Sequence, residues 1–250
     1  MNAAGMPSQA SAPSVGAHTE SLPLEQRWSS IPTARTVMIP GPAGHLEGLL
    51  NSGSQDAPFA ALLCHPNPAY GGNMHHKVLY RAMKVMNDPE WGLGWPVLRF
   101  NFRGTGLSEG THDGKAEVED VLAALDWLNQ HFHLPLFVGG FSFGSAMALW
   151  ACCGPQKTSH PLKAVFALGL PTQANGHEYH YRFLKDASLP KLFLSGDSDA
   201  FGPAPQLNQV AAAAAEPSRL VLIPGADHFF TDHLEPMQQS LARWIKEQLR

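Results

Sequence analysis

The sequence predicts an α/β fold with a mostly parallel central sheet and helices on both of its faces. Short apolar stretches of strand length alternate with stretches of helical spacing along the chain, and this alternation is typical of a parallel sheet covered on both sides. Hydrophobic residues make up 44% of the 250 residues and charged residues only 15%. We therefore expect a well-buried protein with one large core.

Composition changes sharply near the start of the chain. Residues 1–26 are rich in Ala, Ser, Pro and Gly and offer too little apolar surface to offset the entropy of ordering them. We expect a flexible tail at 1–26 without a secretory signal, followed by a single α/β domain over residues 33–250.

The first part of the domain contains strands at 36–39 and 45–50, which flank a turn rich in Gly and Pro. The segment 59–64 (FAALLC) is an apolar run of buried-strand length. We expect a helix within 71–86, and the Asn-Asp-Pro sequence that follows is expected to end it. The segment 97–102 (VLRFNF) has the composition of the next strand.

The middle of the domain holds the clearest helix, at 116–132. Its apolar residues share one face, and acidic residues stand at its start, where the helix dipole favours them. Residues 134–154 then run without a charge over about the length of a membrane span. Pro, Gly and Ser interrupt that run, so we expect a buried strand at 136–141 and a buried helix at 142–152.

The remaining elements continue the alternation to the end of the chain. Apolar runs bounded by turn residues predict further strands, and the last segment has amphipathic helical spacing. The expected elements are strands at 164–168, 191–195 and 220–223 and a closing helix at 237–249.

Charge and cysteine content narrow the class of function. The net charge is −4 and the basic residues are scattered, so we expect neither nucleic acid nor a membrane surface as a partner. Cys64, Cys152 and Cys153 form neither a disulfide framework nor a zinc-binding spacing. We expect free thiols, no metal or other cofactor, and a cytoplasmic location.

The sharpest local signal is the sequence GFSFG at 140–144, between a predicted strand and a predicted helix. In this context G-x-S-x-G forms a tight turn that projects the serine hydroxyl above the sheet. Glycine on both sides removes Cβ atoms that would collide with the strand and the helix. Ser142 is therefore the candidate nucleophile.

A serine nucleophile needs a base and an acid that orients the base. His228 follows the last predicted strand, and Asp199 follows the strand at 191–195, so both stand where α/β sheets collect their sites. Asp197 in the same loop is the second choice for the acid. The order Ser, acid, His is the order found in this kind of site. The other histidines weighed for this role are expected to be surface or loop residues: His75, His76, His131, His133, His160, His177, His180 and His233.

The loop after the strand at 59–64 is the candidate oxyanion loop. Pro66 and Pro68 stiffen it and carry no N–H group, which leaves the backbone N–H of Asn67 as the natural donor. The second donor is the backbone N–H of Phe143, directly after the nucleophile. His65 is expected to brace this loop rather than to transfer protons.

Five motifs in this order resemble the α/β-hydrolase superfamily over nearly all of residues 33–250. The pattern is most similar to small bacterial serine hydrolases related to dienelactone-hydrolase-like and acyl-peptidase-like proteins. The matching segments are HPxPxxGG at 65–72, RFNFRGxGxSxG at 99–110, GFSFG at 140–144, GxxD at 196–199 and GxxHFF at 225–230.

The resemblance implies roles for individual residues. It assigns the nucleophile to Ser142, the acid to Asp199, the base to His228 and the oxyanion donors to Asn67 and Phe143. The turn at 103–108 is expected to brace the mouth of the site. Dienelactone hydrolases carry cysteine at the elbow and haloalkane dehalogenases aspartate, so a serine favours acyl transfer through an acyl-enzyme.

Two features bear on the substrate. Asn67 stands where related proteins often have a second histidine, which leaves a backbone donor intact and alters the rim. The interval 171–190 has room for a small aromatic cap and not for a large lid. We therefore expect an open cleft for short or medium acyl esters.

Three readings of the function remain open at this point. The first is hydrolysis of a carboxylic ester or thioester. The second is a serine peptidase or amidase, and the third is a non-catalytic binding protein on the same fold, since a fold does not fix a function. The sequence leaves the natural substrate and the oligomeric state undetermined.

Overall fold

The computed structural model describes Met1 and residues 33–174 and 176–250. Apart from Met1, the flexible tail predicted at residues 1–26 lies outside the described residues.

Eight strands form one sheet in the order β1-β2-β4-β3-β5-β6-β9-β10. β1 pairs antiparallel with β2 and β2 antiparallel with β4, whereas the other neighbouring strands are parallel. The predicted mostly parallel sheet is thus confirmed. The strands are β1 (Ala34–Gly41), β2 (Gly44–Asn51), β3 (Ala60–Cys64), β4 (Val97–Phe100), β5 (Leu136–Phe141), β6 (Leu162–Leu168), β9 (Lys191–Gly196) and β10 (Ser218–Ile223).

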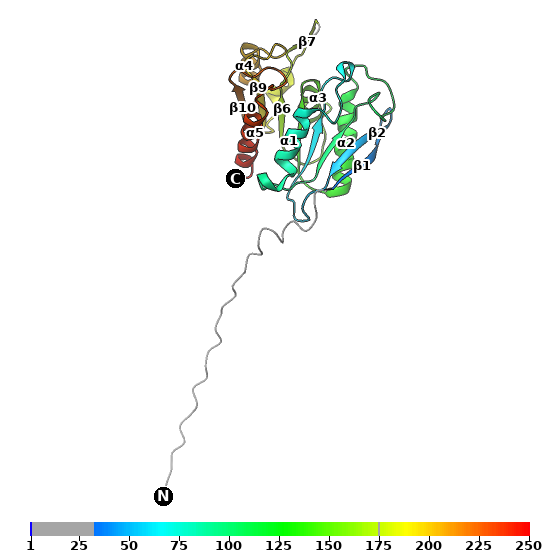
Figure 1. The fold of residues 1–250 in the computed structure, drawn as a ribbon, viewed down its shortest axis with the longest axis vertical. Helices are drawn as coiled ribbons and strands as arrows, with labels where there is room; N and C mark the ends of the chain where they lie inside the picture. The colour runs from blue at the N-terminus through cyan, green and yellow to red at the C-terminus, as the bar shows by residue number, and fades with distance from the viewer. Residues whose placement is uncertain (2–32, 175) are drawn as a thin grey trace.

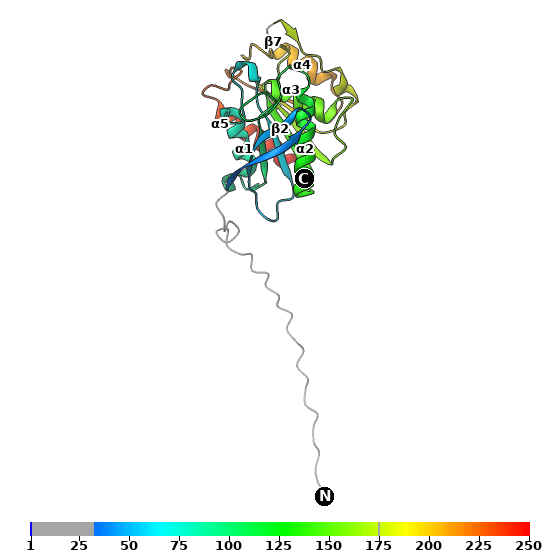
Figure 2. The ribbon, with the colours of Figure 1, turned by 90° about the vertical axis from the view of Figure 1, so that its right-hand side faces the viewer.

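Helices cover both faces of this sheet (Figures 1 and 2). α1 (Lys77–Asn87) and α5 (Leu234–Gln248) contact each other on one face. α2 (Glu117–Phe132) and α3 (Phe143–Cys153) contact each other on the opposite face, and α4 (Ala204–Ala213) contributes a buried leucine to the core beneath them.

The central strand β5 shows how the sequence divides the core in two. Leu136 and Val138 belong to the core on the α2/α3 side, and Phe137 and Phe141 to the core on the α1/α5 side, because successive side chains of a strand point to opposite faces. A Cβ atom on Gly139 would lie 2.2 Å from the ring of Phe166 on the neighbouring strand. Glycine is therefore required there to admit that ring.

Most element boundaries differ from the sequence prediction by one to three residues. Within the interval 71–86 that was predicted to contain the first helix, the helix begins at Lys77, because Pro68–Tyr70 forms a 3-10 turn that Gly71 ends with a φ of 79°. The strand expected at 97–102 ends at Phe100. The backbone N–H of Asn101 still donates to Glu47 O of β2, but that of Phe102 donates to the ring of His65 in the loop after β3.

The helix α4 was not predicted. Pro203 stands directly before it, and the segment is rich in alanine. Both features favour a helix, but the segment carries a single fully buried residue, Leu207, so its apolar periodicity is weak.

The interval 171–190 holds only small structures among its described residues. β7 (Gln173–Ala174) and β8 (His177–Glu178) form a two-stranded hairpin at the upper end of the domain in Figure 1, followed by a 3-10 turn, Arg182–Asp186. The hydroxyl of Tyr181 is buried and donates to Pro171 O over 2.6 Å. The expectation that a large lid is absent is confirmed for this interval.

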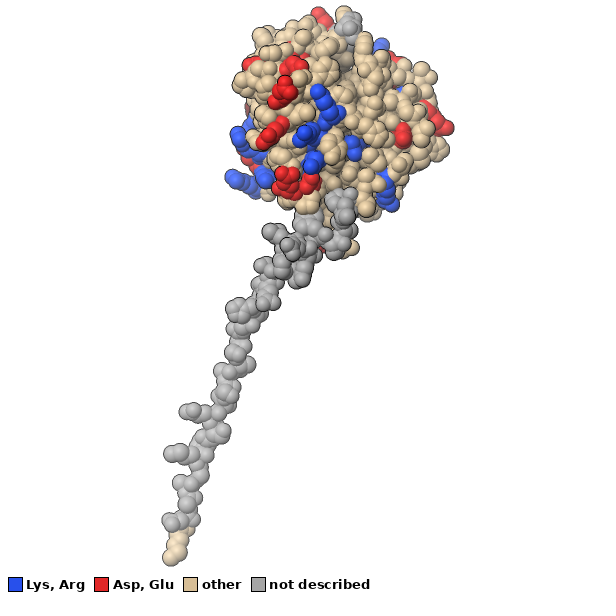
Figure 3. Space-filling view, in the orientation of Figure 1, with Lys and Arg blue, Asp and Glu red and all other residues tan. Residues whose placement is uncertain are grey.

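The cysteines and the surface bear on other predictions. Cys64, Cys152 and Cys153 are buried and unpaired, as predicted. None of the described helices has the length and apolar content needed to cross a bilayer. On the face seen in Figure 3, acidic and basic side chains lie among one another rather than forming an area of one sign.

Candidate active site

The topology places a crevice at the carboxyl ends of β3 and β5. After β3 the chain passes through α1 on one face of the sheet, and after β5 it passes through α3 on the other. Ligands of open α/β sheets bind where neighbouring strands diverge in this way. Cys64, the last residue of β3, pairs with Gly140 of β5, so the predicted oxyanion loop and the predicted nucleophile turn begin side by side.

Ser142 occupies a strained turn between β5 and α3. Its φ is 54° and its ψ is −125°, a backbone conformation that residues with a side chain rarely adopt. A Cβ atom on Gly140 would lie 2.4 Å from the backbone carbonyl of Gly144, and one on Gly144 would lie 2.3 Å from Cys64 O. Both glycines of the motif therefore permit close backbone contacts that hold the serine in place.

His228 brings its ring to the serine from the loop after β10. Its Nε2 lies 2.9 Å from Ser142 Oγ, and its side chain is almost fully buried. The loop that carries it packs tightly on the end of β9: a Cβ atom on Gly196 would lie 2.0 Å from Ala226 O, and Ser198 N donates to the same oxygen. The two loops thus fix the position of the imidazole.

Asp199 holds the other side of the imidazole ring. Its Oδ2 lies 2.8 Å from His228 Nδ1 and accepts a hydrogen bond from Ser195 Oγ, and its Oδ1 accepts from the N–H groups of Phe201 and Gly202. Burial acts to raise the pKa of Asp199, but the hydrogen bonds from His228, Ser195 and Phe201 outweigh it and hold the pKa below its usual value. The carboxylate is therefore charged when the ring is neutral.

Asp197, the second choice for the acid, is directed elsewhere. It is exposed, and its Oδ1 accepts hydrogen bonds from Gly225 N and Ser198 Oγ. These bonds join the loop after β9 to the loop after β10. Of the two carboxylates that the sequence offers in this loop, only Asp199 contacts His228.

The two predicted oxyanion donors lie at the same cavity as Ser142. Asn67 and Phe143 both line it, and within the described residues neither backbone N–H has a hydrogen-bond acceptor. Phe143 begins α3, where the first N–H groups have no partner within the helix. Asn67 O accepts from Tyr70 N and Gly72 N, and a Cβ atom on Gly72 would lie 2.1 Å from Pro66 O. The loop is therefore rigid, with its free donor at the cavity.

His65 braces this loop, as predicted. Its Nδ1 lies 2.6 Å from Pro66 O, so this nitrogen carries the proton, and its Nε2 accepts from Phe102 N. The side chain is fully buried, and burial lowers the pKa of His65 to about 3. The ring is thus neutral and occupied at both nitrogens.

The turn at 103–108 is held by a buried ion pair. Arg103 donates through Nε and Nη2 to both carboxylate oxygens of Asp120 at 2.7–3.0 Å, and its backbone N–H donates to the same group. Burial raises the pKa of Asp120 in spite of these bonds. These contacts fasten the turn to α2, whereas none of residues 103–108 lines the cavity at Ser142.

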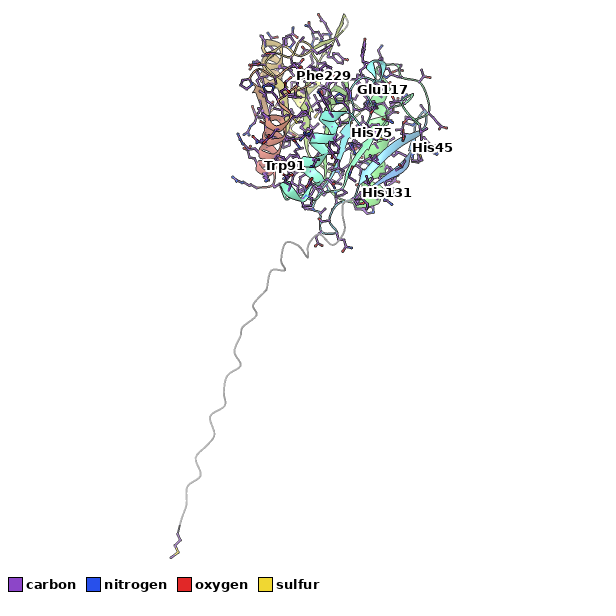
Figure 4. The ribbon with its side chains drawn as sticks, viewed as in Figure 1. His45, His75, Trp91, Glu117, His131 and Phe229 are labelled. Carbon is purple, nitrogen blue, oxygen red and sulfur yellow. The ribbon has the colours of Figure 1, made fainter. Side chains whose placement is uncertain are left out.

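The cavity at Ser142 has a volume of about 190 Å³ and an aromatic rim. Tyr70 and Phe229 are 71% and 43% exposed at its border. Figure 4 shows Phe229 at the upper end of the domain, far from Trp91 and His131 at the lower end. Of the five phenylalanines near the triad, Phe141 and Phe230 are core residues, whereas Phe143, Phe201 and Phe229 line the cavity.

His76 is a loop residue, as expected, and the structure adds that it is part of the candidate site. It lines the cavity, its ring stacks on Phe141 with centroids 4.9 Å apart, and its Nδ1 accepts from Val78 N at the start of α1. Burial and the nearby Lys77 and His228 lower its pKa to about 4. His76 follows the predicted oxyanion loop closely in the sequence, and this position could have indicated a place near the site.

The described residues offer no group of three or more His, Cys, Asp or Glu side chains that could hold a metal ion. What the site does contain is a serine hydroxyl, an imidazole and a carboxylate in one hydrogen-bonded chain, next to two unpaired N–H groups. Such an arrangement is suited to nucleophilic attack on a carbonyl carbon.

Comparison with known proteins places the chain among hydrolases. Residues 69–247 match the α/β hydrolase domain family. An uncharacterized protein of Rickettsia prowazekii is 35% identical over 214 residues, which cover 82% of this chain and 86% of the relative.

Solved structures agree with this match. An α/β serine hydrolase homologue from Coxiella burnetii superposes with a TM-score of 0.72 at 29% identity, over 86% of this chain and 99% of that one. A serine hydrolase without a lid from Xanthomonas campestris superposes with a TM-score of 0.71 at 25% identity, over 87% of this chain and 96% of that one. The fold, the topology and these matches together establish that the chain belongs to the α/β hydrolase family.

Proposed function

We propose that this protein is a serine hydrolase that cleaves a carboxylic ester or thioester through an acyl-enzyme on Ser142. The observation that carries the proposal is the continuous chain from Ser142 Oγ to His228 Nε2 at 2.9 Å and from His228 Nδ1 to Asp199 Oδ2 at 2.8 Å. A hydrogen-bonded nucleophile, base and orienting acid is the arrangement that activates a serine.

In the first half of the reaction, Ser142 Oγ attacks the carbonyl carbon while His228 Nε2 takes the hydroxyl proton. The carbonyl oxygen becomes an oxyanion and accepts hydrogen bonds from the backbone N–H groups of Asn67 and Phe143. Asp199 stabilises the imidazolium that forms. As the tetrahedral intermediate collapses, the proton passes from His228 to the leaving alcohol or thiol.

In the second half, water replaces the alcohol. His228 Nε2 takes a proton from the water, whose oxygen attacks the acyl carbon, and the same two N–H groups bind the second oxyanion. Collapse releases the carboxylic acid and returns the proton to Ser142 Oγ. Every proton in the cycle is thus carried by His228.

The size of the cavity favours a small group at the reacting carbon. Its volume of about 190 Å³ is below the range of about 300–1,000 Å³ that is usual for pockets that enclose drug-sized ligands. The hairpin β7–β8 is the only additional structure among the described residues of the interval 171–190 besides a 3-10 turn. We therefore propose short or medium acyl esters as substrates, and we place the reaction in a reducing compartment such as the cytoplasm, because the three thiols are unpaired.

The test is covalent labelling with a fluorophosphonate, read out by intact and peptide mass spectrometry. A stoichiometric adduct on Ser142 is expected in the unmodified protein and in Ser198→Ala, because Ser198 is an exposed serine of the acid-bearing loop. The adduct is expected to be absent from Ser142→Ala. An unlabelled, folded protein would overturn the proposal and favour a binding role.

A second measurement separates esters from amides. p-Nitrophenyl butyrate and butyryl p-nitroanilide differ only in the atom that leaves. Turnover of the ester with little turnover of the anilide is expected; equal or faster cleavage of the anilide would assign the protein to amide hydrolysis instead.

A further inference from the structure

A second and larger cavity lies beside the candidate active site. Its volume is about 540 Å³, within the range of about 300–1,000 Å³ that is usual for small-molecule sites. Apolar side chains of two helices form much of its wall: Val118 of α2 and Met147 and Trp150 of α3. The exposed side chains of Lys115, Glu119 and Glu178 border it at the surface.

The two cavities share a wall. Tyr179, directly after β8, lines both of them. α3 also joins them, because Phe143 lines the cavity at Ser142 and Met147, one helical turn later, lines the larger cavity. Residues four apart on a helix lie next to each other on one face. The two cavities are therefore neighbours along α3, with Tyr179 between them.

The larger cavity lies on the opposite side of the sheet from the residues that flank the base. His76, which precedes α1, stacks on Phe141, and the ring of Phe141 also contacts His228 and Phe229. The leaving group of an ester has to lie near His228 Nε2, which protonates it. The α1/α5 side is thus the side of the alcohol, and the α2/α3 side is left for the acyl group.

We propose that the cavity between α2, α3 and β8 is the acyl subsite, and that it binds the distal, apolar part of a medium-length acyl group. This inference rests on the proposed function. The cavity at Ser142 holds the ester carbon and its first carbons, and Tyr179 separates it from a wall of Met147, Trp150 and Val118. Methionine and tryptophan suit such a wall, because the first adapts its shape and the second offers a large apolar surface.

The test fills the larger cavity and leaves the triad untouched. Val118 is half-buried and lines the cavity from α2, so Val118→Trp occupies its volume. Leu189→Trp is the matched control, because Leu189 is a half-buried apolar residue that lines a separate cavity near Pro190. Met147→Phe is a milder second variant in case Val118→Trp does not fold.

Two ester series separate the acyl side from the alcohol side. For p-nitrophenyl acetate, butyrate, hexanoate and octanoate, Val118→Trp is expected to keep the kcat/KM of the acetate and to lose about tenfold or more on the octanoate. For ethyl, butyl and hexyl acetate, no selective loss is expected. Leu189→Trp is expected to leave both series unchanged.

Other outcomes overturn specific parts of the inference. A kcat/KM that Val118→Trp leaves unchanged, or lowers by the same factor, for all four acyl lengths would show that the larger cavity does not hold the acyl group. A selective loss in the alkyl acetate series would assign the cavity to the alcohol. Absence of both ester turnover and fluorophosphonate labelling in the unmodified protein would overturn the proposed function itself, and the subsite with it.

Discussion

Asp199 and His228 face each other across 2.8 Å, from Oδ2 to Nδ1, and neither side chain is free to turn away. Three further hydrogen bonds hold the carboxylate, from Ser195 Oγ and from the N–H groups of Phe201 and Gly202. The ring of His228 is in turn bordered by Phe141, Phe201 and Phe229. The carboxylate thus fixes which nitrogen of His228 carries the proton and which one faces Ser142.

Asp199→Asn, which replaces this carboxylate with an amide, is expected to abolish most of the activity without unfolding the protein. Asn at position 199 can present its NH2 group to His228 Nδ1, which favours the tautomer with its proton on Nε2, where the base has to accept one. The expected loss in kcat is about 10⁴-fold, measured with p-nitrophenyl acetate. Asp197→Asn is the matched control, because its side-chain oxygen still accepts from Gly225 N, and it is expected to retain activity. An equal loss in the two variants would contradict the assignment of the acid.

Gly144→Ala is expected to lower activity through the oxyanion loop. The new Cβ atom would lie 2.3 Å from Cys64 O and 2.4 Å from His65 O, so the loop that carries Asn67 has to move away from Phe143. Displacement of one oxyanion donor costs about 10²–10³ in kcat. The comparison is Gly92→Ala, a glycine with a φ of 74° and no atoms near its Cβ position, which lies far from the site and is expected to lose stability only. Full activity in Gly144→Ala would show that this contact does not set the donor geometry.

Arg103→Met is expected to destabilise the fold by about 3–5 kcal/mol, because it leaves the carboxylate of Asp120 buried without its partner. Urea unfolding provides the free energy. The double variant Arg103→Met/Asp120→Asn is expected to recover part of the loss, since the amide oxygen can still accept from the backbone N–H of residue 103. Strict additivity of the two single changes would exclude this ion pair as the source of the effect.

The stability of the fold is expected to fall between pH 7 and pH 5 in a way that depends on His65. The folded protein keeps this ring neutral down to a pKa of about 3, whereas the unfolded chain binds a proton below its usual pKa of about 6.5. Unfolding therefore takes up a proton in this range, so the stabilisation is complete above pH 6.5 and decreases as the pH falls.

The expected loss attributable to His65 between pH 7 and pH 5 is about 2 kcal/mol. It is measured as the difference between the unmodified protein and His65→Gln, each unfolded in urea at the two pH values, because the contributions of all other groups cancel. Parallel pH dependences in the two proteins would show that His65 is not held neutral by the fold.

Much of the architecture could be predicted because local signals and tertiary structure agree. Strand 60–64 and helix 117–132 lie within two residues of their predicted bounds. α4 was missed because its weak apolar periodicity gave no signal to weigh against a loop. The interval 71–86 was correctly predicted to contain a helix, but the sequence did not give its start at Lys77, because the loop geometry of Gly71 and Gly72 depends on contacts with Pro66 and Asn67 rather than on local preference.

The sequence by itself determined the family of the fold and the residue types of the candidate site. The spacing of apolar residues determines which helices and strands form. The G-x-S-x-G turn needs its glycines because a Cβ atom at either position would collide with a neighbouring backbone. The tertiary structure decided which of two carboxylates faces His228. It also decided that His76 lines the cavity and that a second cavity lies beside the first. These properties depend on distances between residues far apart in the chain, such as Asp199 and His228 or Val118 and Tyr179, and a one-dimensional pattern carries no such distances.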